Sequence, residues 1–369
     1  FATDPATRAR LQGEAGNSLV ATGNPRGLDH VREALSVLDP ETNPLETANA
    51  IAIEGRFHHL AGQHEKALEL LTRAAELVAP ASTPETVSLF AASVITTIYA
   101  WLAGAYQHSG LFSDGDVWAR RAIEFGVSHN ILIAQALGNE FLAEDAINSG
   151  DHAAGLEYAR REIEIAEKLH SRERRAWAQF SAAMNAMGGG DLDLAEREFK
   201  KGIEIAESIG ELRLHSLLRG NLATLQADQG QLAGDRQRLD EALQTAQENF
   251  EQGESLGLIY SRAEARRCLA HVHFRRGELD EAERLCAESL ELISATESRV
   301  SRLWLGPLYI QLLLAISEQA SAAGDAEKAA TKRAEAANHL ERYTKLVASC
   351  QSPRFSREVE RLSKLLPRS

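Results

Sequence analysis

Glycines at regular spacing are the feature of this sequence that most constrains its fold. Seven of them recur along the 369-residue chain: Gly62, Gly110, Gly150, Gly190, Gly230, Gly277 and Gly324. The successive steps are 48, 40, 40, 40, 47 and 47 residues. A period near forty residues, without sequence identity between the copies, is typical of a helical-repeat solenoid, in which each repeat buries its apolar face against its neighbours. We therefore expect an all-α fold with a long surface for holding another molecule.

Small residues stand at fixed distances from these glycines, as closely crossing helices require. Seven residues before them lie Gly55, Ala103, Ala143, Ala183, Ala223, Ala270 and Ser317. Five residues after them lie Ala67, Gly115, Gly155, Ala195, Asp235, Ala282 and Ala329, of which six are small. Each glycine is expected to end the first helix of a pair, because a left-handed backbone costs glycine little. The aspartates that directly follow three of them are expected to cap the second helix: Asp151, Asp191 and Asp325.

The pattern resembles the tetratricopeptide repeat (TPR). In the clearest copy, residues 50–80, the family's signature positions coincide, within one place, with Gly55, Gly62, Ala67, Ala74 and Pro80. The segments GLFSDGDVWARRA, GDLDLAEREFKKG and GELDEAERLCAES match nearly as well, although the usual tryptophan of the first helix is missing. The forty-residue spacing is most similar to the arrays of MalT-like regulators, kinesin light chain and the LGN scaffold. The resemblance implies a right-handed superhelical solenoid of seven to eight helix pairs with a C-terminal capping helix.

Three segments follow from this pattern. Residues 1–40 read as a degenerate N-terminal helix pair, because Gly16 and Gly23 keep the seven-residue spacing. Residues 41–350 form the TPR-like array, and residues 351–369 form the capping helix, which is expected over 356–366 after Pro353 stops the preceding helix. Since the first residue is Phe1 rather than methionine, we expect the chain to be a piece of a longer protein or a processed or trimmed chain.

Composition excludes several partners. The net charge of −13 argues against a nucleic-acid surface, which needs clustered lysine and arginine. The basic stretch at 172–175 (RERR) is interpreted as a solvated corner between helices. No apolar run approaches the length of a membrane span, so no membrane is expected as a partner. The three cysteines show neither metal spacing nor an even count, which favours a reducing, cytoplasmic compartment.

No motif in the sequence supports catalysis or a cofactor. There is no phosphate-binding GxxxxGK[ST] segment, and the three glycines at 188–190 stand where the period places a turn. The histidine pairs at 58–59 and 271–273 have no Cys, Asp or Glu that completes a metal-ligand set, so no metal is expected. No Ser/His/Asp or Cys/His arrangement can be defended from spacing. We expect the chain to be no enzyme.

The resemblance also implies where a partner binds, since the first helices of TPR pairs line the inner face of the array. The implied contacts are Arg56, Trp101, Phe141, Glu144, Phe180, Met184, Met187, Asn221, Arg267 and His271. Three consecutive repeats supply the large apolar members of this set, including both methionines of the chain. Such side chains anchor peptide segments. The alternative is that they pack between neighbouring first helices, an interpretation slightly favoured for Phe180. Asn221 resembles the asparagine with which forty-residue arrays hold a peptide backbone.

Two classes of function remain. In the first, the chain is the sensor part of a larger bacterial regulator similar to MalT-type signalling ATPases. In the second, it is a stand-alone adaptor that binds a peptide segment in its concave groove. The partner is a protein or peptide segment in both, with a small-molecule inducer as the alternative occupant. The residues encoded upstream of Phe1 discriminate the two classes, because a P-loop there indicates a regulator and a start codon an adaptor.

Overall fold

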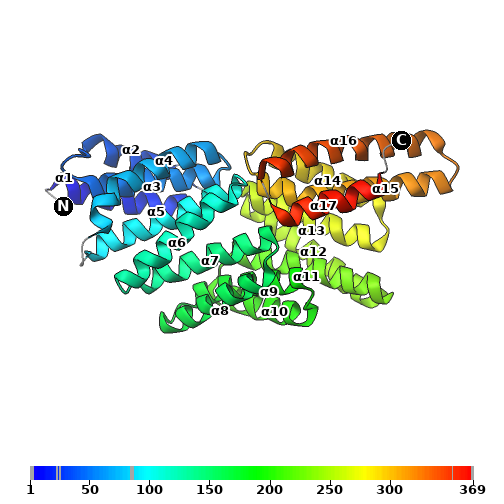
Figure 1. The fold of residues 1–369 in the computed structure, drawn as a ribbon, viewed down its shortest axis with the longest axis horizontal. Coiled ribbons are helices and arrows are strands. Elements are labelled where there is room, and N and C mark those ends of the chain that lie inside the picture. The colour runs from blue at the N-terminus through cyan, green and yellow to red at the C-terminus, as the bar shows by residue number, and fades with distance from the viewer. Residues whose placement is uncertain (1–3, 22–23, 25, 84–86, 351, 367–369) are drawn as a thin grey trace. The chain divides into compact units, whose positions relative to one another are not determined.

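The fold is all-helical over the part of the chain that the structure, a computed structural model, describes, namely residues 4–21, 24, 26–83, 87–350 and 352–366. The α-helices are α1 (Pro5–Ala21), α2 (Arg26–Val37), α3 (Pro44–Leu60), α4 (His64–Val78), α5 (Leu89–His108), α6 (Phe112–Ser128), α7 (Leu132–Ser149), α8 (His152–Lys168), α9 (Arg172–Gly189), α10 (Leu192–Ile209), α11 (Leu212–Ala233), α12 (Arg236–Leu256), α13 (Ile259–Arg276), α14 (Leu279–Ser294), α15 (Arg299–Ala322), α16 (Ala326–Cys350) and α17 (Pro353–Leu365). A short 3-10 helix, η1 (Ala79–Ser82), follows α4. Figure 1 shows the helices as successive pairs, which confirms the predicted solenoid class.

The chain forms two compact units. The first comprises residues 1–142 together with 296–298, and the second comprises residues 143–295 together with 299–369. In the first unit, the segment 296–298 lies at the start of α4, where the carboxylate of Glu297 accepts a hydrogen bond from the backbone N–H of Glu65 (2.7 Å). Residues 1–3, 351 and 367–369, at the ends of the expected segments, lie outside the described residues.

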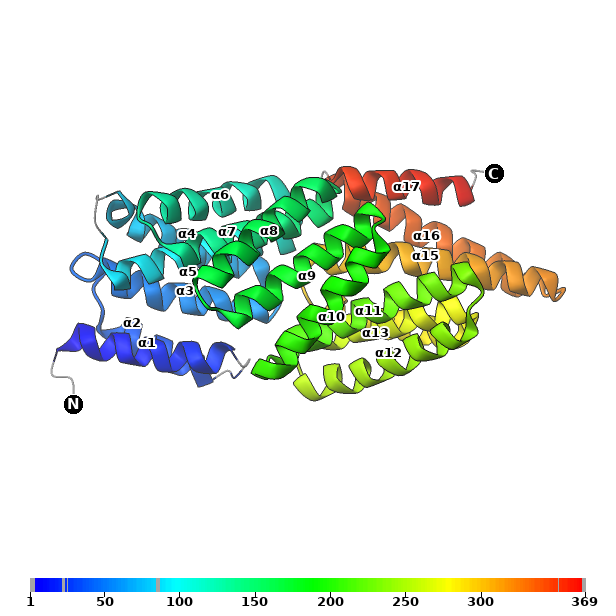
Figure 2. The ribbon, with the colours of Figure 1, turned by 90° about the horizontal axis from the view of Figure 1, so that it is seen from below.

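Within each unit the first helices of successive pairs form a continuous row. In the first unit α1 contacts α3 and α3 contacts α5, and in the second unit α9, α11, α13 and α15 contact one another in that order. The second helices instead contact the first helix of the next pair, as α10 does with α11 and α12 with α13. Figure 2 shows α9, α11 and α13 of the second unit side by side. We call these first helices the inner row of each unit, because the family resemblance places them on the inner face of the array.

The helix ends follow the predicted chemistry with one exception. Six of the seven periodic glycines have a positive φ, between 72° and 87°, where a first helix ends. The three predicted aspartate caps accept hydrogen bonds from the backbone N–H groups of Ala154 (3.2 Å), Leu194 (3.0 Å) and Lys328 (2.9 Å). The exception is Gly230, which lies inside α11, whereas Gly234 (φ 67°) ends that helix. The prediction for Gly230 was wrong because the longer repeat extends the first helix by one more turn.

Burial distinguishes the two helices of a pair. In α9 every residue from Ala176 to Ala186 is buried, so packing surrounds this helix on all sides. In α10 the buried residues recur every three or four positions, at Ala195, Glu198, Phe199, Gly202, Ile205 and Ala206. Such a one-sided stripe is typical of a helix with one face in solvent. The first helices therefore form the core of the repeat, and the second helices cover its outside.

A proline inside α15 is compensated by a side chain of α16. Pro307 has no N–H to donate to the carbonyl of Leu303, one turn earlier. The buried hydroxyl of Tyr343 donates a hydrogen bond to that carbonyl instead (3.2 Å). The ring of Tyr343 also fills the space where a Cβ on Gly306 would stand, 2.5 Å from that ring. The contact joins α15 and α16 closely without leaving an unpaired carbonyl in the core.

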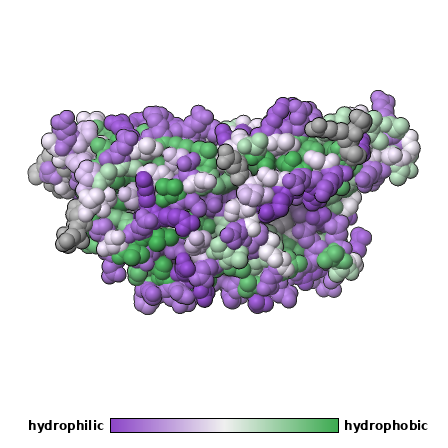
Figure 3. Space-filling model, viewed as in Figure 1, coloured by the Kyte–Doolittle hydropathy of each residue, from purple (hydrophilic) through white to green (hydrophobic). Residues whose placement is uncertain are grey.

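The last helix begins three residues earlier than the sequence predicted. Ser352 caps α17 by accepting a hydrogen bond from the backbone N–H of Phe355 (3.4 Å), and Pro353 occupies the first helical position, which tolerates a residue without an N–H. The helix contacts α15 and α16. Its outward residues, such as Arg357, Glu360 and Lys364, are exposed. The space-filling view shows mainly hydrophilic surface over this helix (Figure 3).

Two helices are more apolar than the sequence analysis anticipated. Among the described residues, α5 and α15 are long and apolar enough to cross a membrane by length and composition. Of their most apolar windows, 61% in α5 and 50% in α15 is buried inside the protein. Both are first helices of their pairs, and burial on several sides demands the same composition as a lipid environment.

The small residue at position 155 is predicted to be essential for packing. A Cβ on Gly155 would stand 2.1 Å from Oδ1 of Asn185. That amide is fully buried, and its Nδ2 donates to the carbonyls of Ala143 (3.0 Å) and Ser181 (2.9 Å). We expect Gly155→Ala to destabilise the second unit by about 2–4 kcal/mol, because overpacking and a displaced buried amide both cost free energy. Urea unfolding measures the loss.

A matched control is Gly190→Ala. Gly190 has a φ of 87°, but a Cβ there would meet no atom within 4 Å. Only the left-handed backbone is then penalised, at about 1 kcal/mol. Equal losses for the two variants would show that the fit around Asn185 does not set the spacing of these helices.

Candidate functional site

The predicted contact residues fall into two groups, one in each unit. Arg56, Trp101 and Phe141 belong to the first unit. The other members belong to the second unit: Glu144, Phe180, Met184, Met187, Asn221, Arg267 and His271. The structure brings residues together within each group, and the two groups are therefore described one after the other.

In the first unit, Trp101 is half-buried and packs against the core of α3, α4 and α5. The guanidinium of Arg56 lies 4.8 Å from the centre of the Trp101 ring, and the ring of His59 lies 5.4 Å from it. Nη1 of Arg56 also donates to Oδ1 of Asn17 on α1 (2.9 Å). Phe141 fills the space beside Gly104, where a Cβ would stand 3.0 Å from its ring. The three predicted residues thus lie on the row α1–α3–α5 and the adjoining part of α7.

In the second unit, the apolar part of the inner row is covered. Phe180 and Met184 of α9 are only 8% and 6% exposed, which they could not be on an open wall. Trp304 of α15 packs against the same cluster, which also includes Ile147 at the end of α7. Met187, one turn beyond Met184, is half-buried. The second unit therefore carries an aromatic side chain from its last pair against the inner residues of its first pairs.

A charged group continues this wall on α11 and α13. Nε of Arg267 donates to Oε2 of Glu264 (2.8 Å), and Nη2 donates to Oδ1 of Asn221 (3.3 Å). Burial raises the pKa of Glu264, and the positive charge of Arg267 more than reverses this, so the pKa of that carboxyl lies below its ordinary value. Asn221 is 2% exposed and Arg267 is 8% exposed. Asn221 thus holds an arginine of the same protein here.

A second polar group lies one turn further along α13. Nε2 of His271 is 2.8 Å from Oδ1 of Asp228 on α11, and Nε of Arg275 donates to the same oxygen (2.5 Å). Burial lowers the pKa of His271, and the nearby Arg275 lowers it further, although Asp228 acts in the opposite direction. The imidazole is therefore neutral at physiological pH. His271 and Arg275 both contact the carboxylate of Asp228.

Sequence reasoning missed Trp304 and Asn148. Nε1 of Trp304 donates to Oδ1 of Asn148, which lies 156 residues earlier in the chain (3.2 Å). Neither residue stands at an inward position counted from the periodic small residues. A tryptophan within the apolar first helix of a longer repeat was the available signal, but its partner depends on how α7 and α15 meet.

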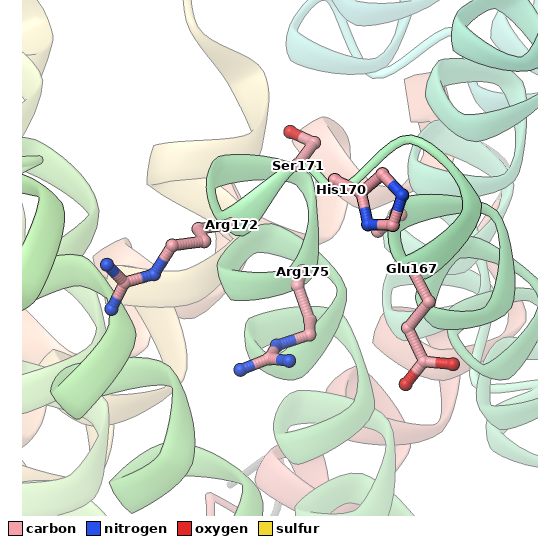
Figure 4. Close-up of a pocket in the computed structure, with 6 residues that line it drawn as sticks. Glu167, His170, Ser171, Arg172 and Arg175 are labelled. Atoms are coloured by element: carbon pink, nitrogen blue, oxygen red, sulfur yellow. The ribbon is translucent and has the colours of Figure 1, made fainter.

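The basic stretch at 172–175 lines an open depression at the turn between α8 and α9. Its walls include Glu167, His170, Ser171, Arg172 and Arg175, which Figure 4 shows as sticks. Arg172 and Arg175 are exposed, and Arg172 donates to the hydroxyl of Ser208. These contacts agree with a solvated corner.

The described residues include possible metal-ligating side chains and cysteine thiols. No group of three or more His, Cys, Asp or Glu side chains among them is arranged to hold a metal ion. Burial raises the pKa values of Cys268 and Cys286 to about 12, so both thiols stay protonated at neutral pH. A protonated, buried thiol is a poor nucleophile.

Comparison with known proteins supports the fold. No protein-family model matches the chain, and no curated protein matches its sequence. A Rap protein complexed with Competence and Sporulation Factor has a TM-score of 0.60 at 14% identity, with 97% of this chain and 98% of that chain covered. The Rap conjugation gene regulator of plasmid pLS20, in complex with the Phr* peptide, has a TM-score of 0.59 at 12% identity and 99% coverage of both chains.

A third solved structure is similar over most of this chain but is itself longer. It is a signal-transduction ATPase with numerous domains (STAND) from Pyrococcus horikoshii that carries a tetratricopeptide repeat sensor. Its TM-score is 0.53 at 15% identity, with 94% of this chain and 55% of that chain covered. Together with the paired helices and the glycine-terminated first helices, these similarities show that the chain has a TPR-type helical-repeat fold.

Proposed function

We propose that the chain is a non-catalytic receiving domain that binds a protein or peptide segment on the inner row of its second unit. The observation that carries the proposal is the composition of that row. It includes two partly buried apolar side chains, Met187 and Trp304, and on the neighbouring helix α13 it includes the guanidinium of Arg267 and the neutral imidazole of His271. Apolar anchors next to a few oriented polar groups are the usual composition of a peptide-binding wall.

The similar structures support this class of ligand. One Rap protein was solved with Competence and Sporulation Factor and another with the Phr* peptide. The STAND protein carries its repeats as a sensor. We propose by analogy that this chain is the sensor part of a larger regulator, with a stand-alone adaptor as the second candidate. Arg56, Trp101 and Phe141 remain proposed contacts in the first unit, and a small-molecule inducer remains the alternative ligand.

The proposal predicts that Met187 contacts the bound segment. Met187 is half-buried at the edge of the inner row, so a charged substitution there is compatible with folding. Peptides are selected from a random twelve-residue display library on the wild-type chain, and their dissociation constants are then measured. We expect Met187→Glu to weaken binding at least tenfold, because an apolar contact is replaced by a charge that must lose water.

The matched control is Leu232→Glu. Leu232 is 87% exposed in the last turn of α11 and lies outside the cluster that contains Met187, so this variant also replaces an apolar side chain by a charge but not at the proposed contact. This variant should bind the selected peptides like the wild type. Selected peptides that bind all three proteins equally, or a library that yields no binder, would contradict the proposal.

A further inference from the structure

The last turn of α7 is completed by side chains that come from the C-terminal helix. The final carbonyls of a helix have no partner within it and carry partial negative charge. The Ser352 hydroxyl donates to the carbonyl of Asn148 (2.6 Å), and Nη1 of Arg354 donates to the carbonyl of Ile147 (2.5 Å). The beginning of α17 thus supplies a hydroxyl and a cation where the end of α7 needs donors.

Trp304 provides the other side of this contact. The guanidinium of Arg354 lies 4.2 Å from the centre of the indole ring, close enough for a cation–π interaction. The Phe355 ring meets the same indole edge to face, with ring centres 6.0 Å apart, and Phe355 is only 3% exposed. Since Trp304 also donates to Asn148, one surface receives the arginine and the aromatic ring together. We call this surface, formed by Ile147, Asn148 and Trp304, the α7–α15 surface.

Arg354 is held by a backbone carbonyl and aromatic rings, whereas Arg267 is held by the carboxylate of Glu264. The pKa of Arg354 is lowered to about 10, with burial as the largest cause and the positive charges of Arg357 and Arg267 acting in the same direction. Arg267 itself lies 6.0 Å from the centre of the Trp304 ring. The guanidinium groups of Arg354 and Arg267 therefore both lie near the Trp304 ring. The repulsion between their positive charges opposes the attachment of α17.

The remainder of α17 is attached by little apolar surface. Of its thirteen residues only Phe355 and Leu362 are buried, whereas α15 buries ten. A terminal helix with so few buried side chains opens locally more readily than the helices of the core. The contacts at its first turn are specific, but the helix as a whole is weakly anchored.

We propose that the α7–α15 surface is a binding site for protein segments that carry an arginine followed by an aromatic residue, and that the first turn of α17 occupies it as an internal ligand. This inference rests on the proposed function, because the surface adjoins the inner row through Trp304. The chain's own sequence at 354–355 defines the chemistry of the partner: a cation for the indole face and the helix-end carbonyls, and a ring for the indole edge. A partner segment of this type binds by replacing α17.

The test uses the full chain and a synthetic peptide of residues 351–366 (QSPRFSREVERLSKLL) carrying a fluorescent label. The double variant Arg354→Ala/Phe355→Ala removes the internal ligand but leaves the surface intact. We expect the labelled peptide to bind this variant at least tenfold more tightly than the wild type, where α17 competes. A peptide with the same two alanine substitutions should not bind the variant. A peptide with Arg361→Ala, which is exposed and pairs with Glu358, should bind like the unmodified one.

Hydrogen exchange provides the second measurement. In the wild type the amides of α17 should exchange at least about tenfold faster than those of α15, and in the double variant only the exchange of α17 should increase. Unchanged protection of α15 also shows that the variant is folded. The proposal is overturned if α17 exchanges as slowly as α15 in the wild type, or if the folded variant fails to bind the peptide. Either failure leaves the Met187 experiment unaffected, since that experiment uses independently selected peptides and the wild-type α17.

Discussion

Acidification from pH 7 to pH 4 is expected to destabilise the first unit by about 3 kcal/mol through His64 alone, since each pH unit between the two pKa values contributes about 1.4 kcal/mol. His64 is 1% exposed at the start of α4, and burial lowers its pKa to about 3, with the charge of His108 as the second cause. The rings of His59 and His108 lie 5.0 and 5.3 Å from that of His64. The partial positive charge of a helix N-terminus also disfavours an imidazolium there.

The direction follows from the two protonation equilibria. In the unfolded chain the pKa of the His64 imidazole is near its ordinary 6.5, so the unfolded state binds the proton first. The stability contributed by neutral His64 is fully present above about pH 6.5 and is lost progressively as the pH falls towards 3. Urea unfolding between pH 7 and pH 4 measures this loss, with the fluorescence of Trp101 and Trp118 reporting on the first unit.

The control variants separate His64 from general acid effects. His64→Gln should unfold with a much smaller dependence on pH, because glutamine does not titrate. His58→Gln is the matched control for the loss of a histidine side chain in the same helix pair; Nδ1 of His58 lies 2.5 Å from Oε1 of Gln63. Identical pH profiles for the wild type and His64→Gln would show that another group controls the acid sensitivity.

Removal of Glu264 should be the most damaging single change on the inner row of the second unit. Glu264→Ala leaves the guanidinium of Arg267, whose side chain is 10% exposed, without a carboxylate partner. Breaking a buried ion pair from one side costs about 3–5 kcal/mol, and we expect the lower part of this range because the Glu264 side chain is 31% exposed. Thermal or urea unfolding of the second unit, followed by the fluorescence of Trp177 and Trp304, measures the loss.

Two comparisons sharpen this result. Glu264→Gln keeps an acceptor for Arg267 and should lose clearly less stability than the alanine variant. Glu281→Ala removes an exposed partner of Arg284 and should change the free energy of unfolding by less than about 1 kcal/mol. The pKa of Glu264 lies below its ordinary value. The wild type should therefore have a higher free energy of unfolding than Glu264→Ala above about pH 4.5, and this difference should decrease as the pH falls further. Equal losses for Glu264→Ala and Glu281→Ala would contradict a buried pair.

Sequence and structure agree best at the helix ends, which depend on the backbone conformation of a few residues. The positive φ at Gly150 and Gly190 and the caps at Asp151 and Asp191 depend on a few neighbouring residues, so their spacing predicted the helix ends. Gly230 departs from the pattern because a longer repeat moves the end of the helix to Gly234. At position 230 a small residue serves packing instead, since a Cβ there would stand 3.0 Å from the side chain of Leu239.

The candidate site was predicted less completely. The family geometry placed Phe180, Met184 and Asn221 on the inner row, and it left open whether the apolar residues bind a partner or pack between neighbouring first helices, with packing slightly favoured for Phe180. In the structure these residues are buried, and Asn221 binds Arg267 of the next pair. Trp304, which no local spacing marks as an inward residue, packs against the cluster that contains Phe180 and Met184.

The sequence by itself determined the repeat: where each first helix ends, which positions must be small, and that two helices form one unit of the array. These properties arise from interactions within about forty residues, and glycine, aspartate and alanine report them directly. Only the tertiary structure decided what meets the inner row, because Asn148, Trp304 and Arg354 come together after the small rotations between successive pairs have accumulated over several repeats. That sum depends on side-chain packing at every interface, and no single motif encodes it.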